Sequence, residues 1–354
     1  MSSASTTTFS SPGKLILIGE YAVLEKAPAV VMAVNRTANV AIRKIDGPAQ
    51  VSAPGLHIHN AVFHIEGDTL QWSNCSTKQQ QALRFFEAAI IESRMVSHKT
   101  SPLPLINVHF RLDTAQFYLP GSTTKLGFGS SASLTYAVVS AALNHMQPQL
   151  QQSPQLLLPI ASAAHYRAQK KVGSGIDVAA AAYTGLLKYE LIEKNNPTTA
   201  EVTPLSWPDD LHLSCVFSGK AVSTRDLVAT IYTLKQNKLT QFVDHISVMT
   251  SQATDACSAL AHADTARFVD IADAYGDSMR LLGEAAGADI VSEDHKQLKQ
   301  IANAQGAAYK PSGAGGGDIG VALSTSKDCI LRSEEAFRKA GYLVIDLAPY
   351  YRQI

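Results

Sequence analysis

The chain has 354 residues, enough for one large or two medium-sized domains whose apolar cores need no disulfide or metal to hold them together. Hydrophobic residues make up 46% and charged residues 17%, which excludes an intrinsically disordered chain. Thirty basic residues balance thirty acidic ones, so we expect neither nucleic acid nor a membrane as a partner, and any anion must be bound locally.

The cysteines and the N-terminus predict the compartment. Cys75, Cys215, Cys257 and Cys329 are scattered, with no C-x-x-C pair and no histidine at metal-ligand spacing, so neither a disulfide framework nor a zinc site is expected. The opening stretch MSSASTTTFSSPGK lacks the basic-then-apolar order of a signal peptide, and no apolar run reaches the length of a membrane span. We expect a cytoplasmic protein.

Strands are predicted to dominate the first fifty residues. Residues 15–18 form a short apolar run that a turn at Gly19 ends, and residues 29–45 are rich in β-branched side chains. Residues 53–72 are typical of hairpins between polar turns.

A helical period then begins, with Ser76 and Gln79 spaced as a capping box. Its apolar residues fall on one face: Leu83, Phe86, Ile90 and Ile91. The remaining elements of the first half are predicted as a strand over 104–113, helices over 134–146 and 156–171, a strand over 184–192 and a loop over 194–202.

The second half is predicted to begin with a strand over 211–219. Helical segments follow at 224–237, 264–287 and 292–305, then a glycine-rich turn and strand within 307–323, and a helix and strand within 333–348 with a stop at Gly341. The whole pattern is α+β. We place the domain boundary near residues 195–207, giving domains of residues 1–205 and 206–354.

The stretch KLGFGSSAS, residues 125–133, precedes an apolar helix. Gly127 and Gly129 allow close backbone approach, and a helix start presents free N–H groups to an anion. The pattern is neither the P-loop, which needs a Lys after its last Gly, nor G-x-G-x-x-G, because Ala132 takes the place of the third glycine. From these residues alone, a phosphate cradle and a plain tight turn are equally supported.

Two further glycine clusters stand out. KPSGAGGGDIG, residues 310–320, is either a mobile surface loop or a turn joining core elements, and its apolar flanks favour the turn. In VGSGID, Asp177 either caps the following helix or acts as an acid/base in a cleft.

Taken together and in order, these clusters and SPGKLILIGEYAVL near the start resemble the motifs of the GHMP kinase superfamily, small-molecule kinases with a P-x-x-x-G-L-G-S-S-A loop. The resemblance runs from residue 11 to about 325. Phe128 departs from the usual Leu of that loop, a change expected to alter loop packing.

Within the superfamily the details resemble the phosphomevalonate kinase branch. Tyr21 follows Glu20, where mevalonate kinases usually carry His, and Lys125 stands two residues before Gly127. AHYRAQKKVGSGIDVAAAAYTG, FSGKAVSTRDLV and SGAGGGD also resemble segments of that branch. The helix before Asp177 has no acidic residue at the place where mevalonate kinase carries a magnesium ligand.

The resemblance implies a two-domain GHMP kinase fold with the active site in the cleft between the domains. The N-terminal domain would be a mixed α/β domain like ribosomal protein S5 domain 2, and the C-terminal domain would be ferredoxin-like. It implies transfer of the γ-phosphoryl group of ATP to (R)-5-phosphomevalonate, with Mg²⁺, by a monomer or homodimer.

The resemblance also implies site residues. Lys14 and Asp177 would be catalytic, and Ser131 would be the magnesium ligand. ATP and its phosphates would be bound by Lys125, Gly127, Gly129, Ser130, Ser131 and Ala132. The acceptor would be bound by Lys14, Glu20, Tyr21, Ser174, Gly175, Ser223, Thr224, Ser312, Gly313, Ala314, Gly315 and Gly316, with Lys171 and Arg225 as further candidates.

Several alternatives stay open at this point. Ser174 is equally a turn hydroxyl, Ser223–Thr224 is equally an N-cap, His165 is more often a packing residue, and Asp318 is expected to stabilise its loop. A phosphate acceptor has a second pKa of ~6 and hardly needs a general base, so Asp177 is expected chiefly to orient Lys14 or the acceptor. Mevalonate kinase or another kinase of the superfamily, a related decarboxylase and a non-catalytic ligand sensor are the competing functions.

Overall fold

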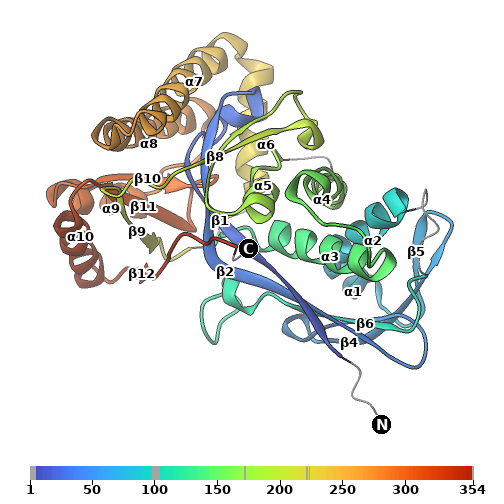
Figure 1. Ribbon diagram of the computed structural model, residues 1–354. Coiled ribbons are helices and arrows are strands. Elements are labelled where there is room, and N and C mark those ends of the chain that lie inside the picture. The colour runs from blue at the N-terminus through green and yellow to red at the C-terminus, as the bar shows by residue number, and fades with distance from the viewer. Residues whose placement is uncertain (1–4, 98–103, 171–172, 221, 223, 353–354) are drawn as a thin grey trace.

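The computed structural model describes residues 5–97, 104–170, 173–220, 222 and 224–352. Its strands form an eight-stranded sheet from the first part of the chain and a four-stranded sheet from the second (Figure 1). The chain passes from one sheet to the other between β8 (Glu201–Leu205) and β9 (His212–Phe217). We therefore propose residues 1–205 and 206–354 as the two domains.

The larger sheet has the order β5-β4-β3-β6-β2-β7-β8, and β1 pairs with β2 outside this path. Its other strands are β1 (Thr7–Ile18), β2 (Ala29–Lys44), β3 (Gln50–Ala53), β4 (Ile58–Glu66), β5 (Thr69–Trp72), β6 (Val108–Asp113) and β7 (Leu186–Glu190). The predicted strands at 15–18, 29–45 and 53–72 are confirmed.

Two strand boundaries differ from the prediction. β1 starts at Thr7 because its Ser/Thr-rich half, although mostly exposed, continues the antiparallel ladder with β2 as far as the Thr7–Ile42 pair. β8 occupies residues predicted as loop and boundary. It is a mostly exposed strand paired to β7, which explains why its sequence lacks an apolar pattern.

The helices of the first part of the chain pack against this sheet and against one another. They are α1 (Thr77–Ala82), α2 (Arg84–Ser97), α3 (Ser130–Met146), α4 (Pro154–Ala168) and α5 (Ile176–Tyr183), with short 3₁₀ turns η1 (Ala22–Glu25), η2 (Pro54–Leu56), η4 (Ala115–Phe117) and η5 (Pro197–Thr199). α3 and α5 pack on β1 and β2, and α2 and α4 pack on α3. The capping box of Ser76 and Gln79 is present, and the predicted helix is divided at Leu83 into α1 and α2.

The second domain has the ferredoxin-like arrangement. Its strands are β9, β10 (Ala308–Ser312), β11 (Ile319–Ser324) and β12 (Leu343–Ile345), and all their pairings are antiparallel in the order β10-β11-β9-β12. Numbered within the domain this order is 2-3-1-4, the βαββαβ pattern. The helices are α6 (Thr224–Asn237), α7 (Leu239–Ala261), α8 (Thr265–Ala286), α9 (Glu293–Ala304) and α10 (Lys327–Lys339). α7 was not among the predicted segments, and Gly341 stands just beyond α10, as predicted.

The two domains share a core. Alternation along β9 turns Val216 towards α9 and α10, whereas Cys215 and Phe217 join a cluster that contains Leu15 and Met32 of the larger sheet. The C-terminal tail also returns to that sheet, because the Tyr350 N–H donates to the Ala33 carbonyl at 2.9 Å. This packing fixes the inner ends of β1, α3, α5 and α6 around one cleft.

No helix in the described part of the chain is long and apolar enough to cross a membrane. The four cysteines are free thiols.

Candidate active site

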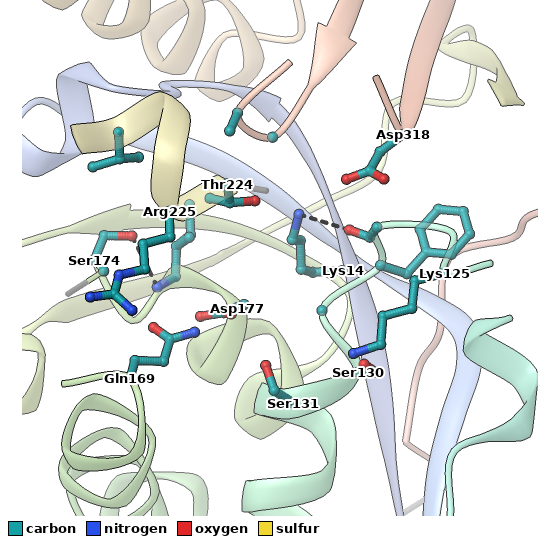
Figure 2. Close-up of a pocket in the computed structure, with 18 of the residues that line it drawn as sticks. Lys14, Lys125, Ser130, Ser131, Gln169, Ser174, Asp177, Thr224, Arg225 and Asp318 are labelled. Atoms are coloured by element: carbon teal, nitrogen blue, oxygen red, sulfur yellow. Dashed lines mark hydrogen bonds between the residues drawn. The ribbon is translucent and has the colours of Figure 1, made fainter. Parts of the chain in front are cut away.

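A cleft of about 940 Å³ lies between the two domains. Its walls come from β1 and η1, the loop before α3, the start of α5, the start of α6 and the glycine loop between β10 and β11 (Figure 2). The predicted site residues that line it are Lys14, Glu20, Tyr21, Lys125, Gly127, Gly129, Ser130, Ser131, Ser174, Asp177, Thr224, Gly313 and Ala314.

The loop before α3 has the backbone that its glycines predict. Gly127 and Gly129 have φ values of 79° and 77°, in the left-handed region that favours glycine. Gly129 is the N-cap of α3 and provides no side-chain cap, so the first N–H groups of the helix stay available to an anion. Ala132 has a fully buried side chain, and it could meet a ligand only through its backbone.

Lys14 and Asp177 lie in the middle of the cleft (Figure 2). Lys14 is 9% exposed, and its ammonium donates to the Gly127 carbonyl at 3.4 Å. Burial lowers the pKa of Lys14, and the carboxylate of Asp177 is the strongest of the neighbouring charges that oppose this shift. Asp177 lies in the first turn of α5, whose N-cap is Gly175, so Asp177 is not the N-cap, although its Oδ1 atom accepts from the Val178 N–H at 3.1 Å.

His165 contacts the starts of α3 and α5. Its Nε2 atom lies 3.1 Å from Ser131 Oγ and 3.9 Å from Asp177 Oδ2, and its ring stacks on Phe85 with centroids 5.3 Å apart. Burial lowers the pKa of His165. The histidine therefore packs as expected, but it also contacts two cleft residues, Ser131 and Asp177.

Two cations, Lys125 and Arg84, line the cleft beside the loop before α3. Lys125 lies 5.8 Å from the centroid of Tyr118, and the guanidinium of Arg84 lies 4.6 Å from that of Phe85. Burial lowers the pKa of Lys125, and the nearby positive charge of Arg84 lowers it further. The sequence analysis did not single out Arg84, because on an amphipathic helix it is indistinguishable from an exposed arginine.

The opposite end of the cleft is also polar. Ser174, Thr224, Arg225 and Gln169 lie there, across Lys14 and Asp177 from Lys125 and Ser130 (Figure 2). Ser174 Oγ accepts a hydrogen bond from the Ile176 N–H at 3.4 Å, so it is a turn hydroxyl that also lines the cleft. Ser223 and Lys171 lie outside the described residues. Gly175 packs against Pro197 and Tyr189 and does not line the cleft.

The glycine loop between β10 and β11 joins core elements and lines the cleft with Gly313 and Ala314. Ser312 differs from its prediction: its hydroxyl donates to the Ile16 carbonyl at 2.8 Å and accepts from the Ile16 N–H at 3.1 Å. Gly315 and Gly316 also differ, because both lie against the segment of residues 289–290, away from the cleft.

Glu20 and Tyr21 hold this loop. Glu20 Oε1 pairs with Lys310 at 2.5 Å and accepts from the Gly313 N–H at 3.2 Å, and the Tyr21 hydroxyl donates to the Ala314 carbonyl. Burial raises the pKa of Tyr21, which keeps its hydroxyl protonated as a donor. Both residues line the cleft, and they also support its wall.

Asp318 faces the cleft, a placement that the sequence analysis did not predict (Figure 2). A Cβ atom built on Gly127 would lie 2.9 Å from Asp318 Cβ, so the aspartate packs directly on the phosphate loop. Burial raises the pKa of Asp318, and Lys14 and Lys125 oppose this shift. Asp318 therefore touches the loop before α3 from the second domain.

Phe128 has a structural explanation. Its side chain is 1% exposed and belongs to the core that the two domains share, together with Phe117 and Leu126. Its carbonyl accepts from the Lys14 N–H at 2.9 Å, which ties the phosphate loop to β1. The larger side chain fills the shared core of the two domains beside the cleft that Phe128 also lines.

Comparison with known proteins agrees with this geometry. Residues 106–185 match the family model of the GHMP kinases N terminal domain. The chain is 25% identical to the phosphomevalonate kinase of Streptomyces sp. (strain CL190), with 96% of each chain covered, and 24% identical to that of Saccharolobus solfataricus, with 96% and 95% covered. The fold matches Streptococcus pneumoniae phosphomevalonate kinase in complex with phosphomevalonate and AMPPNP, with a TM-score of 0.78, 17% identity and coverage of 97% of this chain and 100% of that one. The chain therefore contains a region that matches the GHMP kinase N-terminal domain, and over nearly its whole length it is similar to phosphomevalonate kinases.

Proposed function

We propose that the protein transfers the γ-phosphoryl group of ATP to (R)-5-phosphomevalonate, giving ADP and (R)-5-diphosphomevalonate. One observation carries the proposal: Lys14 and Asp177 lie between a phosphate loop at one end of the cleft and a second polar end with Arg225 at the other. Such a cleft holds two anionic ligands in line, which is what phosphoryl transfer asks of a protein.

The nucleotide would lie on the loop before α3. The free N–H groups of Ser130 and Ser131 and the positive end of the helix dipole suit the triphosphate. Lys14 and Lys125 would neutralise charge on the transferring group, and electrostatic stabilisation of this kind is the main source of catalysis in such reactions. Arg84 adds a third cation at this end of the cleft.

The acceptor would lie between Ser174, Thr224 and Arg225. An oxygen of its phosphate attacks the γ-phosphorus, the bond from that phosphorus to the β–γ bridging oxygen breaks, and ADP leaves. The attacking phosphate is largely dianionic at neutral pH, since its second pKa is ~6. Asp177 is therefore proposed to orient Lys14 and the acceptor, with no proton removal required.

The donor set suits Mg²⁺. The cleft offers hard oxygen donors in Ser131 and Asp177, and the described residues contain no group of three His, Cys, Asp or Glu side chains that could hold a metal alone. Few protein ligands fit an ion that keeps several waters and takes the remainder of its ligands from nucleotide phosphates. We propose Ser131 as the protein ligand, and the bound ion would neutralise charge on the transferring phosphates.

An acceptor panel tests the proposal. ADP formation from ATP and Mg²⁺ is measured with (R)-5-phosphomevalonate, mevalonate and (R)-5-diphosphomevalonate, and release of CO₂ is followed alongside. Turnover of phosphomevalonate that the Lys14→Ala variant loses supports the proposal. Preference for mevalonate indicates a mevalonate kinase, CO₂ release indicates a decarboxylase, and binding without turnover in the unmodified protein indicates a ligand sensor.

A further inference from the structure

The glycine loop between β10 and β11 is anchored along almost its whole length. Every residue from Ser312 to Asp318 except Gly315 makes a hydrogen bond to a group outside the loop. The anchors come from both domains: Ile16, Glu20 and Tyr21 at one end of the loop, and Ile290, His295, Lys220 and Ser218 at the other. This loop is thus held in one conformation although it is rich in glycine.

Among these anchors, His295 is a side chain whose position is fixed by a hydrogen bond at each ring nitrogen. It lies on α9 with 0% exposure, its Nε2 atom is 3.0 Å from the Gly317 carbonyl oxygen, and its Nδ1 atom is 2.8 Å from the Tyr309 hydroxyl. A carbonyl only accepts, so Nε2 must carry the proton and Nδ1 must accept from Tyr309. The contacts therefore select one neutral tautomer.

Burial supports this assignment, since it lowers the pKa of His295 to about 4. The ring thus stays neutral across the range in which a kinase works, and its donor at Nε2 is permanent.

Gly317 is closely packed, and its position determines the position of the next residue, Asp318, in the cleft. A Cβ atom built on Gly317 would lie 2.6 Å from Val222 and 2.7 Å from the Lys220 carbonyl oxygen, so the chain passes closely here. The next residue, Asp318, donates its N–H to the same carbonyl and packs its side chain against Gly127 of the phosphate loop. A displacement of Gly317 therefore moves Asp318 relative to Gly127.

We propose that His295 is a positioning residue for phosphoryl transfer: by donating to Gly317 it sets the glycine loop, and through it the place of Asp318 against the phosphate loop. It lies behind the loop and touches no reacting atom. The kinetic part of this inference rests on the proposed function, whereas its structural part does not.

Two amide variants separate the donor from the mere presence of a polar side chain. In His295→Gln the amide nitrogen takes the place of Nε2 and keeps the donor to Gly317, whereas in His295→Asn it reaches only the place of Nδ1. His109 provides the matched control, because it is also buried and bonded at both nitrogens, to Ser52 at 2.9 Å and Arg43 at 3.3 Å, but lies in β6 outside the cleft.

Amide hydrogen exchange of residues 313–318 is measured in both His295 variants and in His109→Gln and His109→Asn, without substrate. We expect exchange of this segment to rise about tenfold or more in His295→Asn only, with the rest of the protein unchanged. Equal exchange of the segment in the two His295 variants, or equal acceleration in His109→Asn, overturns the proposal.

Turnover with ATP and phosphomevalonate gives the second readout. We expect His295→Gln to keep kcat within about threefold of the unmodified protein and His295→Asn to lose about tenfold or more, because small misplacements of catalytic groups are costly. Equal kcat values for the two variants overturn the positioning role. If the unmodified protein does not act on phosphomevalonate, the proposed function fails, and the exchange experiment still decides the role of His295.

Discussion

The carboxylate of Glu20 and the ammonium of Lys310 form an ion pair of 2.5 Å whose side chains are 2% and 0% exposed. The pair joins the turn after β1 to strand β10, so it connects the two domains behind the cleft wall. The second carboxylate oxygen of Glu20 is buried without a hydrogen-bond partner in the described structure. Burial lowers the pKa of Lys310, and the charge of Glu20 is the main opposing influence.

Lys310→Met is expected to lower the free energy of unfolding by about 3–5 kcal/mol, because it leaves the Glu20 charge buried and unpaired. Urea unfolding measures this, and the double variant Glu20→Gln, Lys310→Met should recover part of the loss. The surface pair of Glu334 and Arg338 is the control, since Glu334→Gln should cost less than about 1 kcal/mol. Equal costs at the two pairs would contradict this account.

The stability of the protein should depend on pH through His295. Its folded-state pKa of about 4 lies below the ordinary value of 6.5, so the unfolded chain takes up the proton first as pH falls. Relative to His295→Gln, the unmodified protein should lose stability between pH 6.5 and 4, by about 3 kcal/mol in total, and nothing more below that.

This difference in unfolding free energy is followed by urea titrations at several pH values. Asp294 and Asp289 raise the pKa of His295 and Lys310 lowers it, so removing either aspartate should lower the folded-state pKa further, whereas removing Lys310 should raise it. A constant difference between pH 7 and 4 would show that His295 is not buried in its neutral form.

Asp177→Asn should reduce kcat by no more than about 100-fold, and raising the pH should not restore it. An essential general base typically contributes about 10²–10⁴-fold, whereas a dianionic acceptor makes proton removal unnecessary. Turnover is measured from pH 6 to 9, with Asp318→Asn as a second cleft carboxylate for comparison. A much larger loss that high pH repairs would instead assign Asp177 as a base.

Arg84→Gln should raise the KM for ATP about tenfold, equivalent to about 1.4 kcal/mol, and leave the KM for the acceptor unchanged. The reason is that Arg84 lines the end of the cleft beside the loop before α3, where its guanidinium donates to the Gln81 carbonyl at 2.9 Å. Arg94→Gln on the same helix is the control, because Arg94 does not line the cleft. A raised KM for the acceptor in Arg84→Gln would contradict this prediction, because it would mean that Arg84 acts at the acceptor end of the cleft.

Phe128→Leu restores the residue usual in the superfamily. We expect it to cost about 1–2 kcal/mol of stability, because it removes volume from the shared core of the two domains, and to leave the KM for ATP unchanged. Thermal unfolding and nucleotide titration measure the two effects. A large change in ATP binding with no loss of stability would mean that the ring acts in the cleft.

The sequence predicted most strands and helices, and it missed elements where the local pattern is weak. β8 is largely exposed, so it has no apolar alternation to detect, and it becomes a strand only because β7 offers it an edge. The division of the helix at Leu83 likewise follows from packing, since the periodicity continues across it.

For the site, the sequence by itself determined the backbone of the loop before α3, whereas the phosphate role of that loop was implied by the resemblance. Its left-handed glycines and the helix that starts at Ser130 are decided within a few residues, because backbone freedom and helix capping are local properties. Lys14 and Asp177 were predicted as site residues from the resemblance of their motifs to those of the GHMP kinases, and both line the cleft.

Only the tertiary structure decided which other side chains face the cleft. Asp318 points into it and Ser312 away from it although both belong to one glycine motif, and Arg84 reaches it from a helix that no motif marks. The pairing of Glu20 with Lys310 joins residues 290 positions apart. Such choices depend on how two domains pack against one shared core, and that long-range packing is absent from any short stretch of sequence.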